Sequence, residues 1–495
     1  MRRTLLPIAF AVATAFGCAS VENPVTGRTE RTVMDERSEV EVGREQHQQV
    51  LAEYGVVKDQ RLQAYVNEVG QKLARSSHRG NLQWTFTVLD SPEVNAFALP
   101  GGYIYITRGI LAYMDSEADL AGVLGHEIGH VTARHGAQRA TRQQTAGLGV
   151  LAATVLGAIL EGRGVGGAGE MASRVSQGVA AGYIASYSRE QELQADRLGA
   201  DYLARANYNP RNMVDVIELL KNQERFAADV ARNEGRQIAQ QPNWLSSHPT
   251  SEQRLQEIRN STQQVATSGT YSNDNRNRYL QMIDGMTFGE SREQGVTRGR
   301  NFYHEVMGFA LTAPQGWRIQ NQADAVTLIN PEGNAGLVLK SVPAQAGRSH
   351  EEIIRNGLKV EQGRTDRYTI NGMPATHVQG ARRDEQGRTQ PVEATVITGP
   401  GGQHYVMIYA AADAGALQRA MRGMQEAESS FRPLSAGERA AARPWRLQTV
   451  PMPSGGFAEL ARRSPLPHAE QHLRLLNGVY AGGNPRPGDL VKIVE

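Results

Sequence analysis

The sequence of 495 residues has little of several features that mark specialised classes of protein. It contains one cysteine, which excludes an intrachain disulfide and a cysteine-rich zinc site. Its net charge is only +2, whereas nucleic-acid-binding proteins usually carry an excess of positive charge, so a nucleic-acid partner is not expected. The mean hydropathy of −0.45 excludes a polytopic membrane protein. The sequence has no tandem repeat of fixed period, so a solenoid fold is not expected. The remaining composition, 40% hydrophobic and 21% charged, is that of a folded chain with several domains.

The single cysteine follows a short apolar run near the N-terminus. Two arginines precede the apolar residues 5–16, and Gly17 stands directly before Cys18. This pattern is typical of a secretory signal peptide over residues 1–17, and the run is too short to span a bilayer. It resembles a bacterial lipoprotein signal, so we expect lipidation of Cys18; a secreted protein with an incidental cysteine is the alternative. Ala19 after the cysteine favours, by analogy with lipoprotein sorting, a periplasmic protein anchored to the outer membrane.

Composition and hydrophobic periodicity divide the rest of the chain into segments. Residues 18–45 are polar and predict a lipidated tether with a first helix. Helical spacing with a few alternating runs predicts a mainly α domain with a small β-sheet over residues 46–265. Polar residues 266–300 predict a linker, residues 301–434 an α+β accessory domain, and residues 445–495 a small βααβ C-terminal domain. The expected fold is therefore multi-domain.

The C-terminal segment has a weak likeness to a known binding module. Residues 445–495, with Asn477-Gly478 and Pro487-Gly488-Asp489, resemble a LysM-type peptidoglycan-binding fold. That resemblance makes peptidoglycan a candidate partner. A small protein-docking domain is the alternative.

The motif that carries chemistry is His126-Glu127-Ile128-Gly129-His130. Residues four apart in a helix share a face, so the imidazoles of His126 and His130 can bind one tetrahedral zinc ion. Glu127 follows the first ligand and can act as general base on a water molecule beside the metal. Two ordinary histidines on a structural helix are the alternative.

The context of the motif predicts a helix. Ser116 and Asp119 have the spacing of a capping box, which places the start of a helix over residues 117–140. His135 would then lie on a different face from His130. Each glycine in a helix lowers its propensity by roughly 1 kcal/mol relative to alanine, so several glycines indicate that another element packs closely. Three stand here: Gly122, Gly125 and Gly129.

A zinc hydrolase needs a third protein ligand and an open position for water. Glu192 and Asp196 are four residues apart on an expected helix over residues 187–204, so one could bind the metal while the other accepts the free ring N–H of a ligand histidine. A solvated acidic face is the alternative. From spacing alone the candidates for third ligand stay open: Glu161, Glu170, Glu190, Glu192 and Asp196.

These motifs together resemble the CAAX prenyl protease type-1 superfamily of zinc metallopeptidases, and within it the branch of periplasmic lipoproteins. The resemblance covers about residues 20–260, including Asn23-Pro24-Val25-Thr26-Gly27 and the run from Asn95 to Gly102. It implies a gluzincin-type metallopeptidase fold, mainly helical with a small sheet beside the metal. The family pattern Glu-x-x-Ala-Asp selects Glu192, rather than Glu190, as third ligand, with Asp196 beside it.

The resemblance also implies roles outside the central motif. A His-Pro pair followed by Arg marks His248 as a possible fourth ligand that holds such enzymes shut, with an ordinary loop histidine as the alternative. Arg254 is a candidate donor to the transition state. An edge strand that pairs with extended substrate backbone is expected at Asn95, Ala96, Phe97 and Ala98.

The expected function is a zinc endopeptidase of the bacterial cell envelope that cleaves unfolded or misassembled proteins in protein quality control. Its expected partners are protein or peptide substrates and, through the N-terminal lipid, a membrane. The alternative is a non-catalytic envelope lipoprotein that acts as a chaperone or wall-binding adaptor, but a structural metal site has no need of Glu127. A membrane-embedded prenyl-protein protease is disfavoured because the chain lacks the apolar length for several spans.

Overall fold

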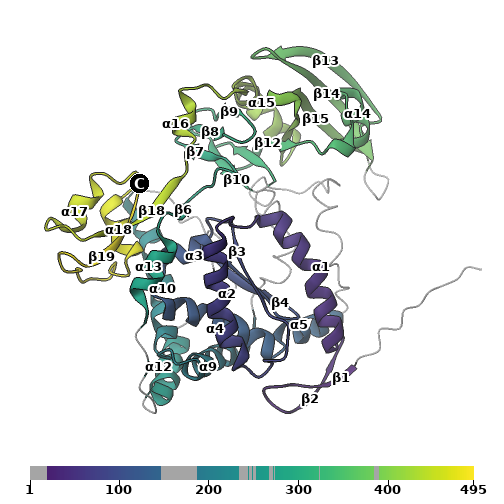
Figure 1. Ribbon diagram of the computed structural model, residues 1–495. Coiled ribbons are helices and arrows are strands. Elements are labelled where there is room, and N and C mark those ends of the chain that lie inside the picture. Colours follow the sequence, from purple (N-terminus) through teal and green to yellow (C-terminus); the bar gives the residue numbers. More distant parts are fainter. Residues whose placement is uncertain are drawn as a thin grey trace, which may run out of the picture.

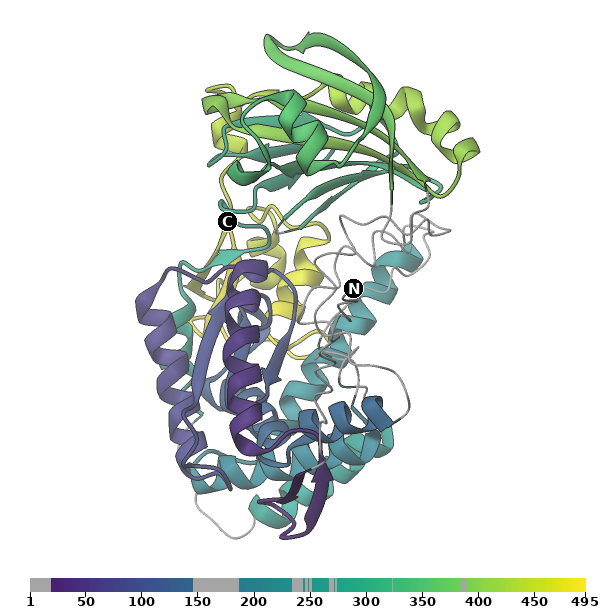
Figure 2. The ribbon, with the colours of Figure 1, turned by 90° about the vertical axis from the view of Figure 1, so that its right-hand side faces the viewer.

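The computed structural model describes residues 19–145, 187–233, 244, 248, 252–266, 271, 274–322, 324–383 and 389–495. Helices dominate the N-terminal half, and a lobe rich in β-sheet lies above them in the views of Figures 1 and 2. The multi-domain organisation expected from the sequence is therefore present at this coarse level. Within the described residues, every helix is too short or too polar to cross a bilayer.

The helical body surrounds a small mixed sheet. Strand β5 pairs in parallel with β3 and antiparallel with β4, so β4 lies at one edge (β3 Thr85–Leu89, β4 Ala96–Leu99, β5 Tyr103–Thr107). The helices are α1 Glu36–Tyr54, α2 Gln60–Arg75, α3 Arg108–Tyr113, α4 Glu117–Thr132, α5 His135–Thr145, α9 Arg189–Arg205, α10 Asn212–Asn233 and α12 Glu252–Ala266.

Helix α4 is the buried centre of this body. Its start is the capping box expected from the sequence: the N–H of Asp119 donates to Ser116 Oγ at 3.1 Å, and the N–H of Ser116 donates to Asp119 Oδ2 at 3.0 Å. Every residue of α4 is buried. Helix α9 packs closely along it: a Cβ added at Gly129 would lie only 2.9 Å from the carbonyl oxygen of Ala195 in α9. The close contact that the glycines predict is confirmed.

Helix α4 ends earlier than the sequence predicts. The expected helix over residues 117–140 is interrupted at Arg134, whose φ of 61° lies in the left-handed region. A new helix, α5, begins at His135. The interruption carries no glycine or asparagine as a signal, and it changes the direction in which His135 points.

The segment expected to be a tether is folded against this break. Strands β1 (Ala19–Glu22) and β2 (Thr29–Thr32) form a hairpin, and Asn23 at its turn donates to the carbonyl of Ala133 at 3.1 Å. Arg134 donates to the carbonyl of Met34 at 2.6 Å. The described part of this segment is thus packed against the helical body, and the expected first helix, α1, begins within it at Glu36. The signal peptide and Cys18 lie outside the described residues.

The segment expected to be a linker, residues 266–300, also contains packed structure. Helix α13 (Arg276–Ile283) and the short strands β6 (Thr287–Phe288) and β7 (Val296–Arg298) lie within it. Three apolar side chains of α13 are fully buried in the core of the helical body: Tyr279, Leu280 and Ile283. Few apolar residues among many polar ones concealed this helix from composition analysis.

The C-terminal unit has the order of elements that the sequence predicts. Strand β18 (Trp445–Pro451) pairs with β19 (Leu490–Val494), and helices α17 (Gly456–Ala461) and α18 (Ala469–Leu476) connect them. The unit shares one hydrophobic core with α4, and β18 also pairs with β6. Lys492 is buried and donates to the carbonyls of Ala112 and Met114. Binding of this unit to peptidoglycan stays a prediction.

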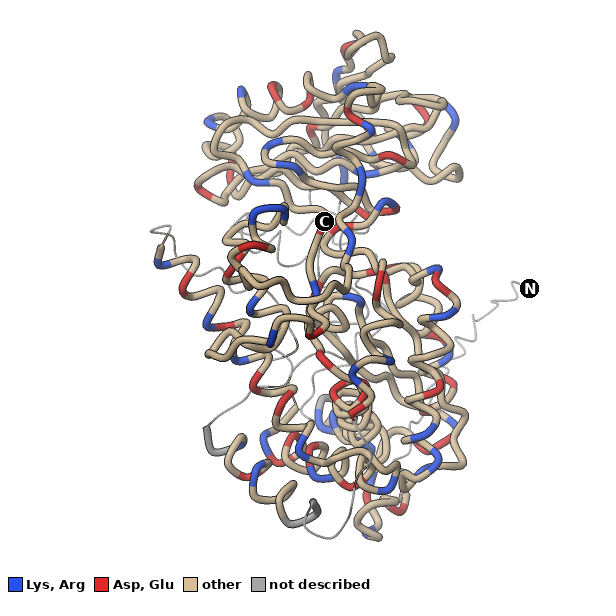
Figure 3. The backbone as a smooth tube through the Cα atoms, turned by 60° about the vertical axis from the view of Figure 1, so that its left-hand side comes forward, with Lys and Arg blue, Asp and Glu red and all other residues tan. Residues whose placement is uncertain are grey.

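The sheet-rich lobe has a core of its own and contains the α+β elements expected between residues 301 and 434. Its seven-stranded antiparallel sheet has the order β10-β11-β12-β16-β15-β14-β13, and a smaller sheet has the order β17-β9-β8-β7. The strands are β8 Asn301–His304, β9 Phe309–Thr312, β10 Arg318–Asn321, β11 Val326–Ile329, β12 Ala335–Ser341, β13 Gln362–Ile370, β14 Met373–Arg383, β15 Thr389–Thr398, β16 His404–Ala411 and β17 Arg432–Pro433; the helices are α14 His350–Glu352, α15 Ala414–Ser429 and α16 Glu438–Ala441. Figure 3 shows acidic and basic residues interspersed over both lobes, in keeping with the balanced net charge.

Candidate metal centre

Two imidazoles extend from α4 one helical turn apart. The Nε2 atoms of His126 and His130 lie 3.0 Å from each other. Both side chains are at most 1% exposed because α4 runs through the centre of the body. The local helix that the motif requires is therefore present, and it directs both rings to one point.

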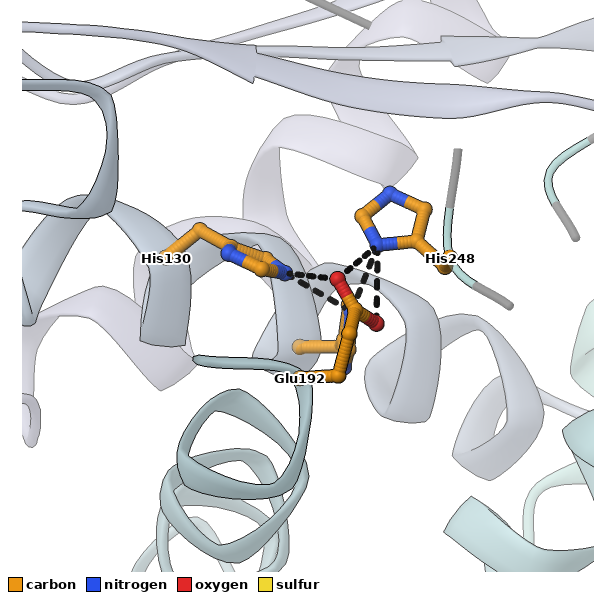
Figure 4. A group of neighbouring side chains, drawn as sticks. His130, Glu192 and His248 are labelled. Atoms are coloured by element: carbon orange, nitrogen blue, oxygen red, sulfur yellow. Dashed lines mark hydrogen bonds and ion pairs between the residues drawn. The ribbon is translucent and has the colours of Figure 1, made fainter. Parts of the chain in front are cut away.

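A carboxylate from α9 and a third imidazole complete the cluster. Helix α9 starts at a second capping box, formed by Ser188 and Gln191, which places Glu192 in its first turn. Glu192 Oε1 lies 2.9 Å from His248 Nδ1 and 3.5 Å from His130 Nε2, and these three side chains converge in Figure 4. One ligand atom of each of four buried residues lies within 4.8 Å of the others: His126, His130, Glu192 and His248.

The spacing of these atoms fits a tetrahedral metal ion. Metal–nitrogen distances of ~2.0–2.1 Å in a tetrahedral site separate neighbouring ligand atoms by roughly 3.3 Å. Five of the separations, counted to either oxygen of Glu192, run from 2.9 Å to 3.6 Å, and all four ligand atoms lie within 4.8 Å of one another. Burial and the neighbouring histidines hold the pKa of His130 well below its ordinary value, so this imidazole is neutral and offers a lone pair. Three imidazoles and a carboxylate are a donor set that zinc binds well.

Asp196 and Arg254 contact two members of the cluster, His126 and Glu192. Asp196 Oδ1 lies 2.9 Å from His126 Nδ1, the ring nitrogen that faces away from His130. Arg254 pairs with both oxygens of Asp196, at 2.7 and 2.9 Å, and its Nη2 lies 3.0 Å from Glu192 Oε2. Burial would raise the pKa of Asp196, but Arg254 and His126 lower it to about 2, so it is a carboxylate at neutral pH. These contacts make Arg254 the counter-ion of two acids, and its expected role in the transition state stays a prediction.

Glu127 lies beside the cluster without joining it. Its Oε1 accepts a hydrogen bond from the indole N–H of Trp244 at 2.9 Å and lies 3.5 Å from His248 Nε2. Burial raises its pKa, against the opposing effects of His248 and Trp244. The backbone N–H of Trp244 also donates to the carbonyl of Val94, next to β4. Sequence reasoning missed Trp244, since nothing in its neighbourhood links it to a residue 117 positions away.

The outer face of His130 carries further contacts that the sequence did not reveal. Its Nδ1 lies 2.9 Å from His135 Nδ1, and His135 Nε2 lies 3.0 Å from Gln194 Oε1. The ring of Tyr187 stacks on His130 with centroids 4.0 Å apart. The five-residue spacing of the two histidines was the available signal, but only the break at Arg134 brings their rings together.

The other candidate residues fall in several places. The expected substrate strand, Asn95 to Ala98, is buried and includes part of the edge strand β4. Glu190 is exposed on α9 and does not belong to the cluster. Glu161 and Glu170 lie outside the described residues. A small, partly open pocket is lined by His130, Tyr187 and the end of β4, at Ala98 to Gly101.

Comparison with known proteins shows which family this site resembles. The model of peptidase family M48 matches residues 60–262. The chain is 28% identical over 266 residues to the β-barrel assembly-enhancing protease of Yersinia pestis, covering 50% of this chain and 51% of the relative, and 29% identical over 255 residues to that of Escherichia coli, covering 51% and 50%. It is 31% identical over 199 residues to mitochondrial metalloendopeptidase OMA1 of Arabidopsis thaliana, covering 40% and 36%.

The likeness concerns one part of the molecule. The chain spans about half the length of the two bacterial relatives that it matches. Among solved structures, that of cyanobacterial PsbP from Synechocystis aligns with 28% of this chain and 98% of its own at 11% identity, but the TM-score of 0.20 supports no conclusion. The matched residues include His126, Glu127, His130 and Glu192. Residues 60–262, which hold the metal cluster, are therefore similar to the metallopeptidases of peptidase family M48.

Proposed function

We propose that this protein is a zinc-dependent endopeptidase that cleaves unfolded or misassembled proteins in the bacterial cell envelope. The observation that carries the proposal is the buried carboxylate of Glu127, which is next to His126 in the same helix and lies 3.5 Å from Nε2 of His248, a member of the cluster. A structural metal site has no use for an additional base. Similarity to metalloendopeptidases supports the same reaction class.

His126, His130 and Glu192 would hold the metal, which makes zinc the proposed ion. When bound, zinc acts as a Lewis acid toward the scissile carbonyl and lowers the pKa of a water molecule toward ~7. The protein supplies the orientation of the ligands: Asp196 fixes the ring of His126, and Arg254 holds the carboxylates of Asp196 and Glu192. A dication would also lower the pKa of Glu192, which burial raises to about 7.

Glu127 moves the protons of the reaction. Its carboxylate takes a proton from the attacking water and then delivers it to the nitrogen of the leaving amine. Burial favours this exchange, because a raised pKa makes the carboxylate a better proton acceptor near neutral pH. The indole N–H of Trp244 holds one oxygen of Glu127 in place.

Strand β4 is the proposed docking site for substrate backbone. Among the described strands it pairs only with β5, so its other edge can pair with an extended peptide. Folded proteins rarely offer a free extended segment, so this mode favours unfolded substrates. The backbone N–H of Trp244 donates a hydrogen bond to the carbonyl of Val94, just before β4. Trp244 therefore covers the start of this edge.

The proposed location rests on Cys18 and is tested through it. Replacing Cys18 by serine should abolish incorporation of labelled palmitate and release the protein from the outer-membrane fraction. The neighbouring Ser20→Ala variant, which leaves the cysteine in place, should behave as the parent. Labelling that persists in Cys18→Ser would contradict lipidation at this residue.

The Glu127→Gln variant tests the proposed mechanism. Loss of the base should lower casein cleavage by about 10²- to 10⁴-fold, while metal analysis still finds one zinc per chain, because Glu127 is not a ligand. Glu190→Gln is the matched control, since Glu190 is exposed on α9. A parent protein that binds zinc but cleaves nothing would favour the non-catalytic alternative, and full activity in Glu127→Gln would exclude this base.

A further inference from the structure

The ring nitrogen of His130 that faces away from the metal cluster lies in a relay of three side chains. His130 Nδ1 is 2.9 Å from His135 Nδ1, and His135 Nε2 is 3.0 Å from Gln194 Oε1. His135 is fully buried, and Gln194 is half-buried on α9, two residues from Glu192. The relay therefore joins the two helices that supply the ligands, through the first residue of α5.

The positions of the protons in this relay follow from metal binding. A metal on His130 Nε2 uses that lone pair, so the ring proton of neutral His130 lies on Nδ1. His135 Nδ1 must then accept a hydrogen bond, which places its own proton on Nε2. That N–H donates to the amide oxygen of Gln194. Each of the three side chains has one orientation and one protonation pattern that satisfies all contacts.

We propose that His135 is a positioning residue that holds His130 in its metal-binding tautomer and orientation, and that Gln194 holds His135 in turn. This inference rests on the proposed function, since it assumes that His130 is a ligand. His126 receives the corresponding support from the carboxylate of Asp196, at 2.9 Å. Buried partners of ligand histidines typically contribute 10- to 100-fold to metal affinity.

The charges around the site explain why the partner of His130 is a neutral ring. Three carboxylates are buried here, those of Glu127, Glu192 and Asp196, and the guanidinium of Arg254 is buried with them. A dication and one guanidinium balance three carboxylates. A fourth carboxylate at position 135 would leave one uncompensated buried charge, which is costly. A neutral imidazole orients His130 without adding charge.

The break between α4 and α5 makes the relay possible. In a continuous helix, residues five apart are separated by about 140° around the axis, so the two rings would point in different directions. Arg134, with its φ of 61°, turns the chain and brings His135 back toward His130. Bonds from the guanidinium of Arg134 to Met34 and to Glu39 hold this conformation.

Two substitutions of His135 separate the relay from simple packing. His135→Phe keeps a ring of similar size but removes the acceptor, whereas His135→Asn places an oxygen near the position of Nδ1. We expect His135→Phe to raise the zinc dissociation constant about 10- to 100-fold in a chelator competition. His135→Asn should recover most of the affinity. The melting temperatures of the zinc-free proteins should differ much less than the affinities.

Gln194→Met tests the second step of the relay and covers the case in which His135→Phe does not fold. It should weaken zinc binding less than His135→Phe, and the double variant should bind no more weakly than His135→Phe alone, because both remove one pathway. Parental affinity in both His135→Phe and Gln194→Met, or equal losses in His135→Phe and His135→Asn, would overturn the inference. Those results leave zinc binding intact in the parent, whereas a parent that binds no zinc contradicts the proposed function itself.

Discussion

His248 is the fourth residue of the buried cluster. Its Nδ1 lies 2.9 Å from Glu192 Oε1 and 3.2 Å from His126 Nε2, and its carbonyl accepts a hydrogen bond from Arg254. A catalytic zinc site needs one open position. We therefore expect the conformation with His248 in the cluster to be a closed one.

The His248→Ala variant should cleave faster than the parent. If the histidine is withdrawn in about one molecule in ten, its removal raises kcat/KM roughly tenfold, since activity scales with the competent fraction. The measurement is casein or peptide cleavage at equal zinc content, with His377→Ala in the sheet-rich lobe as control. Unchanged or slower cleavage in a zinc-loaded His248→Ala protein would show that His248 does not close the site.

At the scale of helices, the close approach of α4 and α9 sets the distance between the histidines and Glu192. A Cβ at Gly129 would lie 2.9 Å from the carbonyl oxygen and 3.0 Å from the Cα of Ala195, both backbone atoms that cannot move alone. A Cβ at Gly122 meets its nearest neighbours at 3.5 Å, an ordinary contact. There is thus room for a Cβ at Gly122 but not at Gly129.

Gly129→Ala should therefore weaken zinc binding and lower the free energy of unfolding by about 1–3 kcal/mol, as overpacked sites do. Gly122→Ala should leave zinc binding unchanged and add up to roughly 1 kcal/mol of stability through helix propensity. Zinc titration and denaturant unfolding of both variants measure these effects. Equal zinc affinity in the two variants would mean that the contact between α4 and α9 does not set the geometry of the site.

The same scale shows what sequence reasoning can recover. The start of α4 was predictable because Ser116 and Asp119 form a local capping box, and the glycines predicted a close neighbour without naming it. The end of α4 was not, because the left-handed residue is an arginine. Residues near the cluster that come from distant parts of the chain left no local signal: Trp244, Tyr187 and Gln194.

For the whole molecule, the hydrophobic cores define domain boundaries that differ from those expected from the composition of the sequence. The C-terminal unit shares the core of the helical body, so it is a part of that body. The sheet-rich lobe has a separate core. Sequence analysis expected the C-terminal unit to stand alone because shared burial of Leu473 or Ile493 with α4 is invisible in the pattern of either segment.

Substitutions that create a cavity in one core or in the other should differ in their effect on zinc release. Leu473→Ala removes a fully buried side chain of α18 and should cost about 2–5 kcal/mol. It should lower the temperature at which zinc is released, although Leu473 belongs to the C-terminal unit. Met424→Ala, equally buried in α15, should destabilise the sheet-rich lobe and leave zinc release unchanged. Zinc release followed during a thermal ramp distinguishes these results, and an unaffected release in Leu473→Ala contradicts the shared core.

The long-range bonds at the start of α4 also have a consequence in time. Lys492 reaches the carbonyl of Met114 from 378 positions away, and Asn275 and Arg278 bond to Glu117 across more than 150. A nascent chain lacks the bonds to Glu117 until residues near 280 have emerged, and it lacks the bond of Lys492 until residues near 490 have emerged, since distant contacts form late. Helix α4 therefore acquires its full set of contacts only after nearly the whole chain has been made.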